Sequence, residues 1–344
     1  MSGILKKLIL LAVKYLSIFL FIKKLFLPTK NLPDMKKLIV IFCLFIILFA
    51  GAVYFLIPTN QNLTYQTVVS CTESAVSRQI INKGRWPLWW PGQIKNDSVY
   101  SYQSYKYNFK KILLNGIETT IGNNQDSVKG FLQFAYNGND STQFLYTFNY
   151  NFSANPFKKI VQYFQLKKIE NNIENLLADI KKYFDNPENI YGLNIVKQKV
   201  TESSMISLKN TFQHYPSTQE IYGMIQSVKE YIQKKGGEEN DYPMLHVQVE
   251  GPTTFEVMVA IPTKIDLPSE DKFQLKKMVL GKILVAEVKG GIYSVMKGDE
   301  ELTNYISDYK KISPAIPFQS LVTNRLLEAD TTKWITKLYY PIFQ

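Results

Sequence analysis

The chain is poor in cysteine and histidine, with only two of each among its 344 residues. Cys43 lies inside a long apolar run and Cys71 lies outside it, so we do not expect the two to form a disulfide. His214 and His246 have no second histidine or cysteine at metal-ligand spacing. The sequence therefore predicts no metal site, and both histidines are interpreted as surface or structural residues.

The chain also lacks the short motifs that mark common catalytic sites. It has no nucleophile elbow, no phosphate-binding loop and no Ser/His/Asp grouping. We therefore predict no enzyme activity, no catalytic residue and no cofactor. Because some enzymes work without such motifs, a hydrolase stays open as an alternative.

Positive charge is unevenly distributed along the chain. The net charge is +11, but residues 1–58 hold eight lysines and one aspartate, so +7 lies there and only +4 lies in the rest. This excess lies beside apolar segments, where lysine marks the cytoplasmic side of a membrane. A nucleic-acid-binding module needs instead a basic face on a folded domain. The sequence therefore predicts a membrane partner and no nucleic-acid partner.

Residues 38–57 form an uninterrupted uncharged apolar run. A helix needs about 20 such residues to cross the hydrocarbon core. Lys36 and Lys37 precede the run, and no lysine or arginine follows until Arg78. The positive-inside rule then predicts a single-pass anchor with residues 58 onward on the outer, periplasmic side.

Two features leave the amino-terminal organisation open. The small residues Ala50–Ala52 have the form of a signal-peptidase site, so cleavage is an alternative to anchoring. Residues 4–27 are apolar but carry five lysines, which fits an interfacial helix or a first span of a two-pass hairpin. Met35 also resembles a start, so residues 1–34 could be an upstream extension.

Residues 62–190 show the pattern of a strand, a short helix, an antiparallel sheet and one long helix. Asn-Gly and Gly-Asn turns separate the β-like runs. The long amphipathic helix begins after Asn155 and ends before Pro187. The other elements are expected at residues 62–70 (strand), 73–82 (helix), and 100–110, 112–120, 128–136 and 142–152 (strands).

This order, with the segment Trp86–Pro91 after the first helix, resembles the SRPBCC superfamily of START-like carriers. The resemblance implies a helix-grip fold, in which a curved sheet wraps the last helix around a cavity. We interpret Trp86, Trp89 and Trp90 as core or rim aromatics, with a ligand mouth as the alternative.

Residues 196–344 contain an internal repeat. Each half predicts a strand, an amphipathic helix and two further strands, the last ending at Pro262 or Pro341. The first strand and helix are expected at 203–211 and 217–234 in one half, and at 281–289 and 299–311 in the other. Two such units can share a core and leave a cleft between them. The predicted fold class is α+β: a transmembrane helix, a helix-grip module, then a duplicated β-α-β-β module.

Within this repeat, residues 281–284, 287–293, 315–318 and 334–342 resemble the GyrI-like effector-binding domain of bacterial transcription activators. The resemblance implies a central cleft that binds hydrophobic, often cationic, compounds. Two departures matter. A membrane segment stands where those activators have a helix-turn-helix, and Lys337 stands where cation binders have an acidic residue. A lysine there favours an anionic ligand over a cationic one.

We therefore predict a membrane-anchored protein that binds a small hydrophobic or amphiphilic ligand for sensing or sequestration. The alternatives are a small-molecule hydrolase that uses Glu256 or a tyrosine, and a tethered scaffold without a ligand. Strand aromatics also pack in cores, so a core role for each stays open. The candidate ligand-binding residues are Phe255, Glu256, Met258, Tyr293, Phe318, Trp334, Lys337 and Tyr340.

Overall fold

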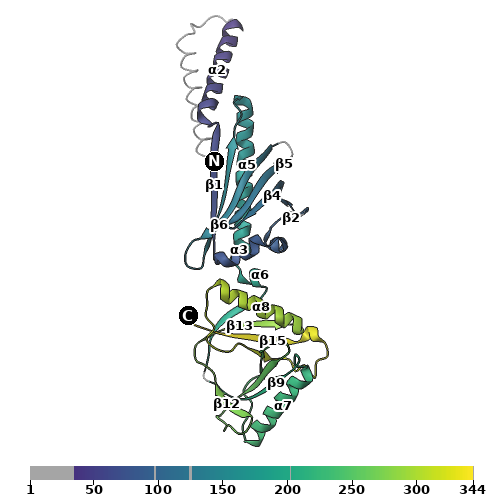
Figure 1. Ribbon diagram of the computed structural model, residues 1–344. Coiled ribbons are helices and arrows are strands. Elements are labelled where there is room, and N and C mark those ends of the chain that lie inside the picture. The colour runs from purple at the N-terminus through teal and green to yellow at the C-terminus, as the bar shows by residue number, and fades with distance from the viewer. Residues whose placement is uncertain (1–34, 97, 124–125, 202, 344) are drawn as a thin grey trace.

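A computed structural model describes residues 35–96, 98–123, 126–201 and 203–343. The expected features of residues 1–34 lie outside this part of the chain. The first described helix, α2 (Met35–Leu56), projects from one end of an elongated molecule (Figure 1). It includes Leu38–Leu56, the one stretch of described helix that is long and apolar enough to cross a membrane. Insertion and orientation remain predictions.

The middle of the molecule is an antiparallel sheet of seven strands, in the order β1-β7-β6-β5-β4-β3-β2. Burial alternates along β7, as expected for a strand with one covered face. The strands are β1 (Asn60–Val69), β2 (Gln93–Ile94), β3 (Val99–Tyr102), β4 (Tyr105–Leu113), β5 (Gly116–Asn123), β6 (Asp126–Tyr136) and β7 (Thr142–Asn151).

One long helix, α5 (Pro156–Phe184), packs along this sheet (Figure 1). It begins where the sequence predicts, because the Asn155 side chain accepts hydrogen bonds from two backbone amides of the first turn. Shorter elements cover the far end of the sheet, and together these residues form the N-terminal unit (60–191). They are α3 (Glu73–Ile81), η1 (Lys83–Arg85), α4 (Trp86–Trp89) and α6 (Pro187–Tyr191).

Aromatic rings fill the interior of the N-terminal unit. Trp86, Trp89 and Trp90 are buried, as expected for core residues. Between sheet and helix, the Tyr107 hydroxyl donates to Asn172 Oδ1 on α5 at 2.5 Å, so these two buried side chains satisfy each other.

The far end of the molecule is a second antiparallel sheet of eight strands, in the order β12-β9-β11-β10-β14-β15-β13-β8. It forms the C-terminal unit (195–342) with α7 (Thr218–Lys234), α8 (Ile292–Asp308) and η2 (Thr331–Lys333). The α+β class with two antiparallel sheets is confirmed. The strands are β8 (Ile195–Lys199), β9 (Ser204–Phe212), β10 (Met244–Val249), β11 (Phe255–Thr263), β12 (Phe273–Lys277), β13 (Lys282–Lys289), β14 (Phe318–Leu321) and β15 (Ile335–Ile342).

The two expected halves are β9-α7-β10-β11 and β13-α8-β14-β15, and they meet where β10 pairs with β14. The prediction of a helix at 299–311 was wrong in its bounds, because α8 begins at Ile292 directly after Gly290 and Gly291. Gly298 interrupts the apolar periodicity of α8 although it faces the sheet. A glycine is needed there, because a Cβ would lie 2.6 Å from Val288. The edge strands β8 and β12 were not predicted.

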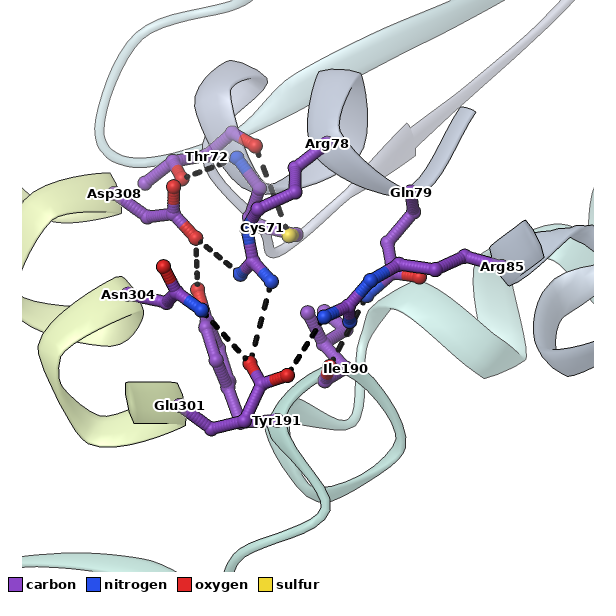
Figure 2. Close-up of polar contacts among 11 residues, drawn as sticks. Cys71, Thr72, Arg78, Gln79, Arg85, Ile190, Tyr191, Glu301, Asn304 and Asp308 are labelled. Atoms are coloured by element: carbon purple, nitrogen blue, oxygen red, sulfur yellow. Dashed lines mark hydrogen bonds and ion pairs between the residues drawn. The ribbon is translucent and has the colours of Figure 1, made fainter. Parts of the chain in front are cut away.

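An ionic cluster joins the two units (Figure 2). Arg78 on α3 donates to Asp308 on α8 at 2.6 Å and contacts Glu301 at 3.3 Å, while Arg85 contacts Glu301 at 2.7 Å. The Tyr191 hydroxyl also donates to Asp308. Burial alone would lower the pKa of Arg78, but the hydrogen bond to Asp308 and the two carboxylates raise it overall. Both carboxylates are nearly buried, so removing one arginine would leave a buried charge without its partner.

Candidate ligand-binding pocket

An apolar pocket of about 230 Å³ opens on the face of the C-terminal sheet away from α7. Alternation along the strands builds it. Leu245 and Val257 point into the core with α7, so the neighbouring residues of β10 and β11 point to the other face. The lining residues are Val200, Met205, Met244, Leu245, His246, Met258, Ala260, Lys276, Lys277, Met278, Val279, Ala315, Ile316, Phe318 and Pro341.

Methionine dominates the pocket wall. Four of the eight methionines in the chain line it: Met205, Met244, Met258 and Met278. Methionine is unbranched and polarizable, so it adapts to ligands of different shape. The volume is slightly below the range of roughly 300–1,000 Å³ typical of small-molecule sites. Such a wall can widen by rotamer changes, which suits a small apolar ligand.

The charged groups of the pocket are all basic. Lys276 and Lys277 line it, and no aspartate or glutamate does. Lys276 has the strand parity of the pocket face. Lys277 has instead that of Leu275, and its amino group is ion-paired with Asp266 at 2.8 Å, outside the lining. An apolar wall with a cationic group and no carboxylate favours a hydrophobic anion over a hydrophobic cation.

His246 is held in place by the backbone. Its Nδ1 lies 2.7 Å from the carbonyl oxygen of Pro317. A carbonyl oxygen only accepts, so Nδ1 carries the proton and Nε2 is left for a ligand or solvent. His246 is therefore a polar group with a fixed ring in an otherwise apolar wall. The lining offers no serine, threonine, cysteine or carboxylate that could act as a nucleophile.

Two of the eight candidate residues line this pocket. Met258 on β11 and Phe318 on β14 reach it from the two halves of the repeat. The Phe318 ring is stacked on that of Tyr339, with centroids 4.8 Å apart. This contact fixes one wall of the pocket.

Phe255 and Glu256 do not line it. Phe255 has the strand parity of Val257, so it lies on the helix-covered face, where its ring contacts Tyr215. Glu256 has the parity of Met258, but its carboxylate is paired with Lys209 at 2.5 Å.

Tyr293 and Tyr340 lie on the helix side of the sheet. Tyr293 on α8 is 85% exposed and faces away from the pocket. Tyr340 packs in the core beneath α8, and its hydroxyl donates to Asp299 at 2.6 Å. Burial and the bond to Asp299 raise the pKa of Tyr340, so it remains a neutral donor.

Trp334 lies before β15, where its indole N–H donates to the Glu328 carbonyl and the Arg325 guanidinium stacks 5.0 Å from its ring. Lys337 shares the sheet face of the pocket but lines a second, polar hollow at the edge of the sheet. Glu188 and Glu287 line that hollow too. Two carboxylates oppose the attraction for an anion that the sequence assigned to Lys337.

Sequence reasoning missed most of the wall. Lys276–Val279 come from β12 and the loop after it, an edge strand without a clear sequence pattern. Met244 could have been found, because the repeat pairs it with Phe318. His246 was singled out by the sequence, but only the sheet register shows that it shares a face with Met258.

Neither a family profile nor a curated protein matches this chain. Among solved structures, the C-terminal domain of EcmrR is similar with a TM-score of 0.39 and 13% identity, over 44% of this chain and 98% of that one. SAV2435 bound to tetraphenylphosphonium has a TM-score of 0.30 and 15% identity, over 44% and 94%. A hydrolase from Listeria innocua has a TM-score of 0.35 and 12% identity, over 44% and 92%. At these values the similarity assigns no function to this chain.

One similar structure corrects an expectation. The EcmrR–DNA complex matches with a TM-score of 0.41 and 14% identity, over 55% of this chain and 72% of that one. The exclusion of nucleic acid as a partner is contradicted by this match to a DNA-bound regulator and was wrong. That expectation rested on how positive charge is distributed along the sequence, and charge distribution gives no information about similarity of fold.

Proposed function

We propose that this protein is a membrane-anchored receptor for a small hydrophobic or amphiphilic molecule, with a preference for negatively charged ligands. One observation carries the proposal: a methionine-lined pocket with Lys276 and no carboxylate in its wall. The chain would bind its ligand for sensing or sequestration, without chemical turnover.

The proposal assigns residues 62–190 to an SRPBCC-like domain and residues 196–344 to a GyrI-like effector-binding domain. The sheet order β1-β7-β6-β5-β4-β3-β2 around α5 supports the first assignment. The two β-α-β-β halves that meet at β10 and β14 support the second. In the N-terminal unit the Trp, Tyr and Phe rings fill the space that a carrier would leave for cargo.

In the proposed topology, residues 38–56 cross the membrane once and both folded units lie on the outer side. The apolar length of α2 and the lysines before it support this orientation. Figure 1 shows the C-terminal unit at the end of the molecule opposite α2, so the pocket would face the solvent away from the bilayer.

The hydrolase alternative has less support. Glu256, its expected carboxylate, is paired with Lys209 and lies outside the pocket lining. A scaffold would need no pocket at all, so ligand binding separates that alternative from the receptor.

A pair of matched probes tests the receptor. Naphthalene-2-sulfonate and trimethyl(2-naphthyl)ammonium have the same ring and opposite charge. We expect calorimetric titration of the full chain in nanodiscs, corrected with empty nanodiscs, to show at least tenfold tighter binding of the anion. Met258→Trp should fill the pocket and weaken binding at least tenfold, about 1.4 kcal/mol. The control is Met296→Trp, at an exposed position on α8, which should bind normally. Equal binding by both variants would place the ligand elsewhere, and no binding at all would favour the scaffold.

A further inference from the structure

The first turns of α5 carry an apolar stripe on their outer side. Phe157, Val161 and Phe164 are 61%, 58% and 52% exposed. Their spacing of four and three residues puts them on one face of the helix. Lys168, also exposed, continues the same face one turn further. Three large apolar side chains in a row are unusual on a helix surface that faces water.

These turns lie beside the end of α2, as Figure 1 shows. Val53 and Ile57 are buried at this contact. On α5, the Lys159 amino group lies 3.4 Å from the Tyr54 carbonyl oxygen and 4.8 Å from the centroid of the Tyr54 ring. The first turn of α5 and the last turn of α2 therefore share one level along the axis of α2.

The length of α2 fixes where that level is in a bilayer. The apolar stretch Leu38–Leu56 has 19 residues. At 1.5 Å per residue it is about 28 Å long, against a hydrocarbon core of about 30 Å. No apolar turn is left over, so Tyr54 and Phe55 must lie at the outer edge of the hydrocarbon. The α5 turn that contacts Tyr54 must then lie at the same depth.

Lys159 fits this depth. The last carbonyls of a helix lack partners within the helix, and water cannot supply donors inside a bilayer. The Lys159 side chain is fully buried and its amino group donates to one of these carbonyls. Its positive charge also lies at the negative end of the α2 dipole.

We propose that Phe157, Val161 and Phe164 enter the lipid leaflet in which α2 ends. This inference rests on the membrane span in the proposed function. The stripe would immerse its first two side chains in acyl chains and the third near the headgroups, with Lys168 beside anionic phosphates. Two helices would then hold the N-terminal unit, which fixes its orientation and keeps the pocket away from the bilayer.

Fluorescent labels at single cysteines test the contact in the full chain, reconstituted in liposomes of phosphatidylcholine and phosphatidylglycerol. In a background with Cys43→Ala and Cys71→Ala, which removes both native cysteines, Phe157→Cys, Val161→Cys, Phe164→Cys and Lys168→Cys carry a nitrobenzoxadiazole label. Nitroxide lipids serve as quenchers. We expect blue-shifted, quenched emission at positions 157 and 161, weaker quenching at 164 and little at 168. The matched control Leu327→Cys, an 85% exposed apolar position in the C-terminal unit, should behave as in water.

Phe45→Cys, in the middle of α2, separates failure of the inference from failure of the anchor. If position 45 is quenched while 157, 161 and 164 behave like 327, the stripe is outside the lipid and the inference is wrong, although the anchor stands. If position 45 is unquenched as well, α2 does not cross the membrane and both fail. Blue-shifted emission at 157 and 161 without quenching would mean that protein, such as residues 1–34 of this chain, covers the stripe, which also overturns the inference.

Discussion

The two units of this molecule share an architecture and differ in where they leave space for a ligand. Each has an antiparallel sheet with one face covered by helix, α5 in the N-terminal unit and α7 with α8 in the C-terminal unit. In the N-terminal unit, rings such as those of Tyr107 and Tyr146 fill the space against α5. In the C-terminal unit, the sheet face away from the helices holds a pocket walled by methionine. The helix-covered interiors of both units are filled by side chains, so space for a ligand remains on the uncovered face of the C-terminal sheet.

A glycine shows how tightly the first interior is filled. A Cβ at Gly130 on β6 would lie 2.6 Å from the ring of Tyr146 on the neighbouring strand. The ring of Tyr146 thus occupies the space that a side chain at position 130 would need. A buried tyrosine also needs a partner for its hydroxyl, and the Tyr146 hydroxyl is in contact with that of Thr119.

The largest effect should follow from emptying the filled interior. Trp89→Ala removes a buried ring that packs against Trp90 and Phe184. We expect it to lower the free energy of unfolding by about 3–5 kcal/mol, as for other buried aromatics. Urea denaturation measures this loss. Leu114→Ala, at an 89% exposed position, should change stability by less than about 0.5 kcal/mol. If both variants lowered the free energy of unfolding only slightly, the N-terminal core would be looser than its packing indicates.

The second-largest effect should follow from weakening the ionic cluster between the two units. Arg78→Met leaves Asp308 without its closest cation, and Arg85 then remains as the cation beside Glu301. Removing one partner of a buried pair costs about 3–5 kcal/mol, and partial exposure of Arg78 reduces this to about 2–3 kcal/mol. Calorimetry should show the melting transitions of the two units separating.

The control for the junction is Lys229→Met, which removes a surface pair with Glu239. We expect a change below about 1 kcal/mol there. If Arg78→Met has an effect as small as this control, the ionic cluster does not couple the units.

Charge reversal should alter ligand binding by the C-terminal unit without unfolding it. Lys276→Glu puts a carboxylate into a pocket wall that has none. We expect anion binding to fall about tenfold and binding of the matched cation to rise, while stability changes little, because surface substitutions usually cost under about 0.5 kcal/mol. Competition between the two naphthalene probes measures the ratio of anion affinity to cation affinity. Lys229→Glu, far from the pocket lining, should leave this ratio unchanged.

The smallest effect concerns the buried thiol at the junction. Burial and the nearby Asp308 raise the pKa of Cys71 to about 12. An ordinary thiol is half ionised near pH 9, but the folded protein would then hold about one thiolate in a thousand. In Cys43→Ala protein, we expect Ellman's reagent to react with Cys71 only as fast as the chain opens.

The raised pKa of Cys71 also makes the stability of the folded protein depend on pH. Between pH 9 and 12 the unfolded chain has released the Cys71 proton and the folded chain has not, so stability falls as pH rises. Rapid labelling of Cys71 at pH 8 in the folded protein would contradict the burial.

Local sequence signals predicted most of the elements, as two examples show. Asn155-Pro156 and Pro187 bound α5, because a cap and a ring that fixes φ act within a few residues. The repeat predicted both sheet halves, although Gly298 hid the first two turns of α8. Of the eight proposed ligand contacts, only Met258 and Phe318 reach the pocket, since strand alternation gives two faces without saying which one a helix covers.

The sequence by itself determined the apolar length of α2, the amino-terminal cap of α5 and the duplicated order of the C-terminal unit. Each of these depends on residues close together in the chain. Only the tertiary structure decided that Arg78 meets Asp308, that Lys276 shares a wall with Met258, and that Phe157 lies at the level of the end of α2. These contacts join segments far apart in the sequence, and they depend on sheet register and on which faces the helices cover.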